Sequence, residues 1–161
     1  MKKLNFAILG AFWAVSLATQ AVADTTIPWT KEGCESVKGI WVTAHSATES
    51  GCDAAHCNGK NFCRSAIEMT WFSALIWCQS IGHKLASFNS LCPGLPTGPN
   101  NTSGACANVK GIDSNYWQWT NFPWETDSAL VVNFGSGGIT SHKRNRYNTN
   151  SPWHNRAACE E

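Results

Sequence analysis

The eight cysteines of this 161-residue chain constrain its fold more than any other feature. They stand at positions 34, 52, 57, 63, 78, 92, 106 and 159. An even number of cysteines in an exported chain is typical of a disulfide framework, which stabilises a domain by restricting its unfolded state. Eight cysteines allow about a hundred pairings, so the count alone does not identify the partners.

The first 23 residues have the organisation of a signal peptide. Lys2 and Lys3 form a positive start, residues 4–18 are almost entirely apolar, and Ala21-Val22-Ala23 offers a small-x-small cleavage site. An uncleaved membrane anchor is the alternative, but this apolar run is short against the roughly 20 residues of a membrane span. We expect cleavage after residue 23, no membrane span after it, and a mature protein that is secreted, periplasmic or on the cell surface.

Charge and motifs exclude several classes of function. The formal net charge is only +1, so no overall charge favours nucleic acid as a partner. The sequence contains no P-loop, no dinucleotide-binding fingerprint and no recognisable hydrolase motif. All cysteines are expected to be structural, so none is free to act as a nucleophile. We therefore predict a protein that is not an enzyme and that needs no cofactor.

Residues 24–61 are predicted to form a cystine-rich N-terminal extension. This stretch is polar, with one β-like patch at Ile40-Trp41-Val42, and its later part, 46–59, has the composition of a loop. So short a segment buries too little apolar surface to fold alone. We expect it to pack on the main domain, 62–161.

A helix is predicted from Trp71, after a strand within 62–69. Thr70 suits the N-cap position, and Gly82 stands where a helix-ending glycine belongs. Apolar residues recur at helical spacing, at positions 71, 74, 75, 78 and 81. Ile76 and Trp77 widen this apolar face, so we expect a mostly buried helix.

The remaining elements are short. A strand or extended link is expected at 83–86 and one or two helical turns at 87–92. Strands are expected at 117–120, 129–134, 139–143 and 155–159, with a glycine-rich turn at 135–138.

The order of these elements, with Trp77-Cys78 in the helix and the ending Cys159-Glu160, resembles the C-type lectin-like domain. Asn115-Tyr116-Trp117 and residues 129–134 are similar to bacterial exported variants of that fold. The resemblance covers about 62–160. It implies an α+β fold with two short helices and a small antiparallel sheet, and a disulfide between Cys78 and Cys159.

The other six cysteines are paired by closeness in sequence, as Cys92–Cys106, Cys34–Cys52 and Cys57–Cys63. Exchange of partners among the four N-terminal cysteines is an open alternative. Zinc held by Cys52, His56, Cys57 and Cys63 is another, although their spacing fits no standard finger and an oxidising compartment favours disulfides.

Calcium-dependent sugar binding is not expected. Sugar-binding C-type lectins carry a Glu-Pro-Asn or Gln-Pro-Asp triplet and a Trp-Asn-Asp triplet, whose oxygens hold the ion. Neither is present, and Trp153-His154-Asn155 has a histidine where calcium prefers oxygen. Asp113, Glu125 and Asp127 are only loosely clustered, so we predict no metal site.

Tryptophans beside amides can stack on sugar rings, and a basic patch can attract anionic glycans. The candidate ligand-binding residues are Trp117, Trp119, Asn121, Trp124, Lys143, Arg144, Arg146 and His154. Core packing is the alternative for Trp117 and Trp119, because they face the same side of one strand. Ordinary solvated charges are the alternative for the basic residues. Trp124 is expected to be the most exposed of the three tryptophans.

We therefore expect an exported, non-catalytic recognition module that binds a glycan or a cell-surface protein without calcium. The alternative is a structural or assembly subunit of a bacterial envelope or pilus-like appendage, which would show a broad apolar patch and self-association. The ligand and the oligomeric state stay open at this stage.

Overall fold

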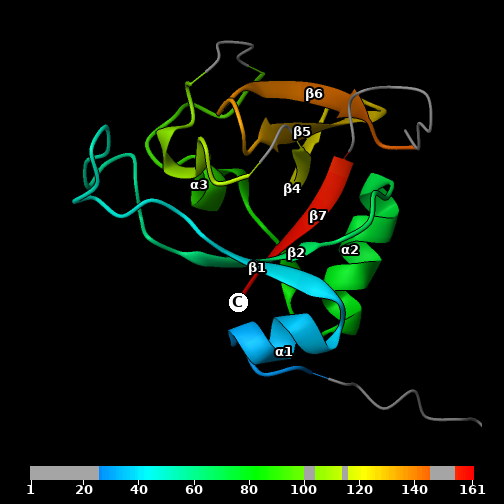
Figure 1. Cartoon of the computed structure of the whole chain (residues 1–161). Coiled ribbons are helices and arrows are strands. Elements are labelled where there is room, and N and C mark those ends of the chain that lie inside the picture. Colours follow the sequence, from blue (N-terminus) through cyan, green and yellow to red (C-terminus); the bar gives the residue numbers. More distant parts are fainter. Residues whose placement is uncertain (1–25, 100–103, 114–115, 146–154) are drawn as a thin grey trace, which may run out of the picture.

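The computed structural model describes residues 26–99, 104–113, 116–145 and 155–161 (Figure 1). Within them the chain has an α+β fold built on one mixed sheet. The strands are β1 (Gly39–Thr43), β2 (Asn61–Ser65), β3 (Lys84–Leu85), β4 (Trp117–Trp124), β5 (Ser128–Asn133), β6 (Ile139–Lys143) and β7 (Asn155–Glu160). The helices are α1 (Lys31–Ser36), α2 (Trp71–Ser80) and α3 (Phe88–Leu91), with a 3-10 turn, η1 (Ala107–Val109). No helix in these ranges is long and apolar enough to cross a membrane.

The C-terminal strand β7 lies in the middle of the sheet, whose order is β1-β2-β7-β4-β5-β6, with β3 also paired to β7 (Figure 1). It runs parallel to β4 and antiparallel to β2 and β3. The sheet is therefore mixed, whereas the family resemblance implied an antiparallel one. The difference arises because β7 does not continue the β4–β5–β6 meander beside β6 but pairs with β4, in the parallel direction, between the meander and the β1–β2 hairpin.

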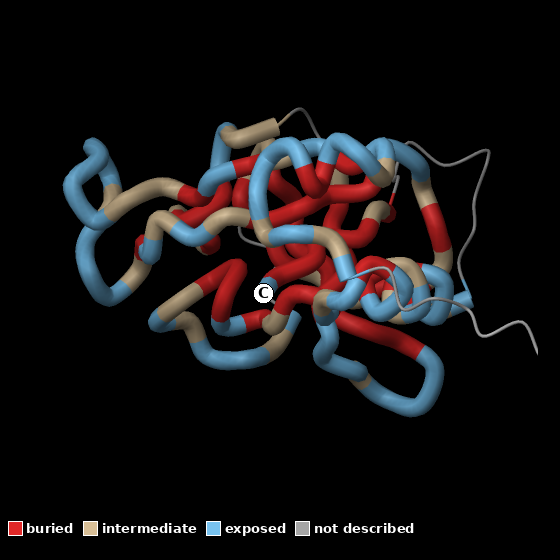
Figure 2. The backbone as a smooth tube through the Cα atoms, turned by 90° about the horizontal axis from the view of Figure 1, so that it is seen from below, coloured by how far each residue is buried: buried red, intermediate tan, exposed pale blue. Residues whose placement is uncertain are grey.

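Strand β5 is buried along its whole length because both faces of the sheet are covered. Successive side chains of a strand point to opposite faces. Ala129 and Val131 accordingly pack into a cluster with α2, and Leu130 and Val132 into a second cluster with α3. Figure 2 shows the buried segments running through the middle of the molecule, with the exposed loops around them. The continuous apolar run in this strand thus reflects burial on both sides.

The predicted start and end of α2 are confirmed. The Thr70 hydroxyl accepts a hydrogen bond from the Ser73 amide at 3.2 Å, and the helix begins at the next residue after this cap. Gly82 follows the helix with a φ of +82°, a left-handed conformation that glycine adopts without strain. Trp71, Ala74 and Cys78 face the core.

The expectation that α2 is mostly buried is wrong. Phe72 and Ile76 are 52% and 66% exposed, and the preceding Ile67 is 70% exposed. Only one side of α2 contacts β7 and β3, so apolar residues on the other side are left at the surface. We call Ile67, Phe72 and Ile76, with the partly buried Trp77, the α2 apolar face.

Four disulfides hold the described residues together. Cys78 of α2 is joined to Cys159 of β7, and Cys92 after α3 to Cys106 before η1, which are the expected partners. The Cys78–Cys159 bond links α2 to the central strand β7. The Cys92–Cys106 bond closes the loop between α3 and η1.

The expected pairs Cys34–Cys52 and Cys57–Cys63 are not formed; Cys34 is bonded to Cys63, and Cys52 to Cys57. The reason is the helix α1, which the sequence analysis did not predict. It places Cys34 against β2, where Cys63 stands in the centre of the β1–β2 hairpin. Gly39 makes room for this bond, because a Cβ there would lie 2.6 Å from both sulfurs.

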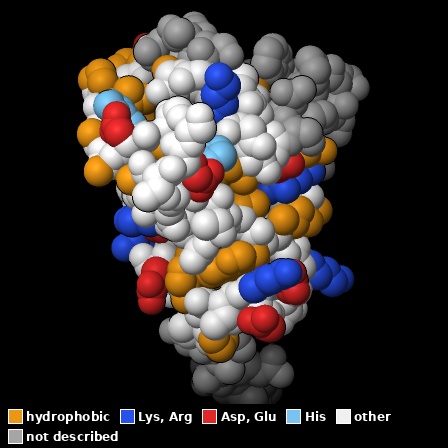
Figure 3. All heavy atoms as spheres, turned by 60° about the vertical axis from the view of Figure 1, so that its left-hand side comes forward, with side chains coloured by type: hydrophobic (Ala, Val, Ile, Leu, Met, Phe, Trp, Pro, Cys, Tyr) orange, Lys and Arg blue, Asp and Glu red, His pale blue; other side chains and the backbone are white. Residues whose placement is uncertain are grey.

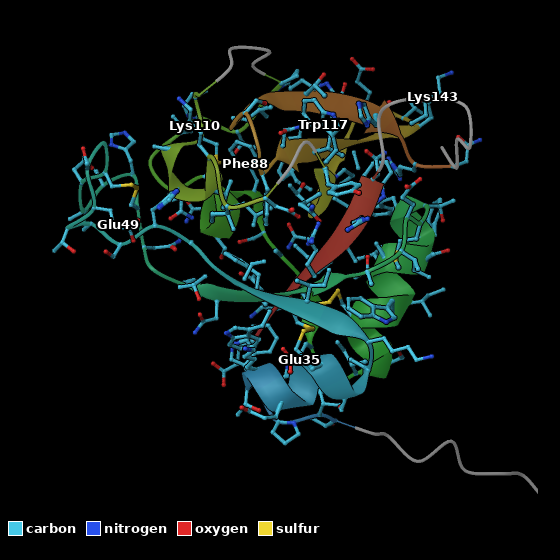
Figure 4. All side chains as sticks on the ribbon, viewed as in Figure 1. Glu35, Glu49, Phe88, Lys110, Trp117 and Lys143 are labelled. Atoms are coloured by element: carbon cyan, nitrogen blue, oxygen red, sulfur yellow. A yellow bond between two sulfur atoms is a disulfide. The ribbon has the colours of Figure 1, made fainter. Side chains whose placement is uncertain are left out.

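The long segment 44–60 is attached to the main body by His45 and by Asn58, whose backbone N–H donates to Asn108 and whose side chain donates to the Ser90 carbonyl. The ring nitrogens of His45 lie 2.5 Å from a Glu49 carboxylate oxygen and 2.7 Å from the Lys110 carbonyl oxygen. Both oxygens favour the protonated ring, so the Lys110 carbonyl first, and Glu49 second, raise the pKa of His45 above 6.5. Figure 4 shows Glu49 in this projecting segment, apart from Lys110 in the main body. A protonated ring, with two donors, suits both contacts.

Candidate functional site

Trp117 and Trp119 are core residues. Trp119 is fully buried, and its Nε1–H donates to the Met69 carbonyl at 2.8 Å. Trp117 is 8% exposed, and its ring lies 5.3 Å from that of His142, a buried histidine (Figure 4). Both tryptophans point to the sheet face that α2 covers, so neither offers a surface to a ligand. We remove them from the candidate set.

The second half of β4 is exposed. Its register with β5 shifts between Trp119 and Pro123, so that Asn121, Phe122 and Pro123 lie at the surface. Trp124 is half-buried: its ring packs beside Gly98, where a Cβ would lie 3.7 Å from it. We call residues 121–124 the β4 surface. It presents an amide, two aromatic rings and a proline on a strand of the central sheet.

Lys143 is an accessible cation at the edge of this surface. Trp124, Ser128 and Lys143 stand opposite one another across β4, β5 and β6. The Lys143 ammonium lies 3.5 Å from the Asp127 carboxylate, and both side chains are exposed. The Ser128 hydroxyl, which donates to that carboxylate, lowers the pKa of Asp127, and the charge of Lys143 lowers it further. Figure 4 shows Lys143 at the end of β6.

Arg144 has a structural role instead. Its guanidinium donates to the backbone carbonyls of Glu125, Thr126 and Ser128 at 2.9 to 3.2 Å, and it lies 5.1 Å from the ring centroid of Trp71. These contacts hold the β4–β5 turn against α2. The other two basic candidates, Arg146 and His154, lie outside the described residues.

A buried ionic cluster lies near the start of β4 and was not anticipated. Arg64 of β2 is 4% exposed and forms an ion pair with Asp113. Burial lowers the pKa of its guanidinium, and Asp113 opposes this effect. Arg156 of β7 lies 3.5 Å from the ring centroid of Tyr116. The cluster connects β2 and β7 to the chain that leads into β4, which is a structural role.

The structure also contains a cleft of about 500 Å³ that was not predicted from the sequence. Its walls include Trp29, Lys60, Asn61, Lys84, Ser90 and Glu160. These residues come from the segment before α1, from β2, β3 and α3, and from the end of β7. No local motif marks such a site, because only the folded sheet brings these segments together. We call it the Trp29 cleft.

The chain matches no family model and no curated protein sequence. In the described ranges no group of three or more His, Cys, Asp or Glu side chains is placed to hold a metal ion. The cysteine sulfurs of the alternative zinc site are all in disulfides. Function is therefore inferred from the fold and from the surfaces described above.

Proposed function

We propose that this protein is an exported, non-catalytic recognition module of C-type lectin-like fold that binds a glycan or a cell-surface protein without calcium. The bond from Cys78 in the helix to Cys159 in the terminal strand supports the fold, because the family resemblance implies it. A framework of four disulfides supports export, because such bonds persist in oxidising compartments.

The β4 surface carries this proposal. Asn121 and Trp124, with Lys143 two strands away across β5, combine an amide, an indole and a cation, which is chemistry suited to sugar rings and polar peptides. The fold holds this part of β4 in place: the backbone N–H of Asn121 donates to the Ala86 carbonyl at 2.8 Å. A preordered surface loses little entropy when it binds.

The carboxylates before and after β4 support calcium independence. Asp113 is paired with Arg64, and Asp127 with Lys143 and Ser128. Neither is left to supply the several oxygen ligands that calcium takes.

We expect glycan binding that survives chelation and is lost in Trp124→Ala. The oxidised mature protein, 24–161, is screened on a glycan array with calcium and again with chelator. For any glycan found, Trp124→Ala should weaken binding roughly five- to 150-fold, if a sugar ring stacked on the indole contributes as much as a stacked base, about 1–3 kcal/mol. Its melting temperature should change little.

The matched control is Ile67→Ala, an exposed apolar residue away from β4, which should bind normally. Loss of binding with chelator would contradict calcium independence. Full binding by Trp124→Ala would show that the ligand site lies elsewhere.

An assembly subunit is the second candidate, and the α2 apolar face favours it. Three of its four residues are more than half exposed, and Ile67, Ile76 and Trp77 line a groove of about 520 Å³. No residue of α2 is charged. Exposed apolar patches of this kind are typical of protein contact surfaces.

If this face mediates assembly, the oxidised protein should self-associate with rising concentration, and Ile76→Glu should abolish the association. The added charge cannot be buried at an apolar contact without a large loss of free energy. Sedimentation velocity over a wide concentration range measures this. Lys143→Glu is the control, because it changes charge outside the face. A native protein that stays monomeric throughout would rule the assembly role out.

A further inference from the structure

The Trp29 cleft contains no residue of the β4 surface and no residue of the α2 apolar face. Its volume of about 500 Å³ lies within the range of small-ligand sites, roughly 300–1,000 Å³. In Figure 1 the C-terminus, which forms part of its wall, lies between α1 and α3. Figure 3 brings that side of the molecule forward and shows a band of apolar side chains among basic and acidic ones.

The aromatic wall of the cleft is held in place before any ligand binds. The Trp29 ring centroid lies 5.1 Å from that of Trp41 and 4.5 Å from that of His83. His83 is itself fixed, because its Nε2 lies 3.0 Å from the Ile27 carbonyl oxygen. The Trp29 ring remains partly exposed to the cleft. An indole ordered in this way can stack on a flat apolar surface at little entropic cost.

The polar wall offers both donors and acceptors in fixed positions. The Lys60 ammonium lies 3.3 Å from the Ser90 hydroxyl oxygen. The side-chain Oδ1 of Asn61 accepts from the Thr43 hydroxyl at 2.8 Å, which leaves the side-chain N–H groups of Asn61 for a ligand. A Glu160 carboxylate oxygen accepts from the Ser87 amide at 3.1 Å, and the carboxylate has further acceptor sites.

The charged side chains of the cleft have both signs, and this selects the class of ligand. Lys60 and Lys84 share its walls with Glu160 and Glu161. An anionic ligand would meet two carboxylates, a cationic one two ammonium groups, and a purely apolar one would strip four charged groups of water. A sugar has a flat C–H face for the indole and hydroxyl groups that donate and accept.

We propose that the Trp29 cleft binds a neutral oligosaccharide, with a sugar ring stacked on Trp29. This goes beyond the proposed function, because it assigns a second binding site away from β4, whatever the β4 surface recognises.

The test uses the oxidised mature protein and a panel of neutral hexaoses built from glucose (α- and β-linked), N-acetylglucosamine, mannose and xylose. Ligand-observed NMR and calorimetry should detect at least one of them. Trp29→Leu keeps apolar bulk but removes the aromatic face, and should weaken that ligand at least tenfold. Trp29→Phe keeps a ring and should bind with an intermediate affinity. Ile67→Ala, which changes an exposed residue outside both the cleft and β4, should bind this ligand as the native protein does.

Several results would overturn the assignment: no neutral hexaose binds, Trp29→Leu binds normally, or an acidic oligogalacturonide competes better than every neutral probe. Asn61→Ala is a second variant in case the tryptophan variant misfolds, because it leaves Trp29 in place and removes one exposed side-chain hydrogen bond, that with Thr43. It should also weaken binding, and normal binding would count against the cleft. Failure here is distinct from failure of the proposed function. A neutral hexaose whose binding requires Trp124 but not Trp29 would leave the β4 site standing and refute this one.

Discussion

Replacing Cys78 and Cys159 together by alanine should lower the free energy of unfolding by about 4–5 kcal/mol. The bond joins residues 81 positions apart, and chain-entropy estimates for a loop of that length give roughly this value. Both cysteines are fully buried between α2 and the sheet. Alanine avoids placing a hydroxyl there, so the effect measured is mainly that of the lost constraint.

Chemical denaturation of the oxidised proteins measures this effect, and Cys52→Ala with Cys57→Ala is the matched control. That pair spans only 5 positions in the projecting segment, so its loss should cost about 2 kcal/mol. Equal losses for the two variants would mean that α2 is held to β7 without help from the disulfide.

Trp119→Ala should destabilise the protein by about 3–5 kcal/mol, which is the usual result of truncating a buried aromatic residue. Trp119 has no exposed surface, and the change leaves a cavity between β4 and α2. It also leaves the Met69 carbonyl without its indole donor. Proteins of this kind are stable by only about 5–15 kcal/mol, so much of the stability would be lost.

Trp124→Ala, on the same strand, is the control for this prediction. Because its ring is only half-buried, the loss should be well below that of Trp119→Ala. Thermal and denaturant unfolding of the two variants compare them directly. A larger loss for Trp124→Ala would contradict the division of β4 into a buried half and an exposed half.

Local sequence signals predicted the elements whose ends are determined by caps and turns, which involve only a few neighbouring residues. Thr70 and Gly82 bounded α2, and the glycine-rich turn at 135–138 separated β5 from β6. Such signals do not depend on the rest of the chain, because a cap or a turn is satisfied by its neighbours.

Local signals did not predict α1. The helix has only six residues, with a glycine and a cysteine among them, and isolated helices of that length are unstable. It exists here because Thr30 caps it and because Cys34 is bonded to β2. Because α1 was not predicted, the N-terminal disulfides were predicted from closeness in sequence alone, and the predicted pairs were wrong.

For the site, the alternation of Trp117 and Trp119 correctly placed them on one face. Sequence alone could not say that α2 would cover that face. Which side of a sheet is solvated depends on the elements that pack on it, and here both sides are covered along β5.

By itself, then, the sequence determined the disulfide-rich character of the domain, the limits of α2 and the positions of the later strands. The tertiary structure decided the parallel placement of β7, the partners of Cys34 and Cys52, the burial of two candidate tryptophans and the existence of the Trp29 cleft. The physical reason is the sequence separation over which the interactions act. Capping and turn preferences act over a few residues, whereas strand order, disulfide partners and clefts depend on which distant segments bury one another's apolar surface.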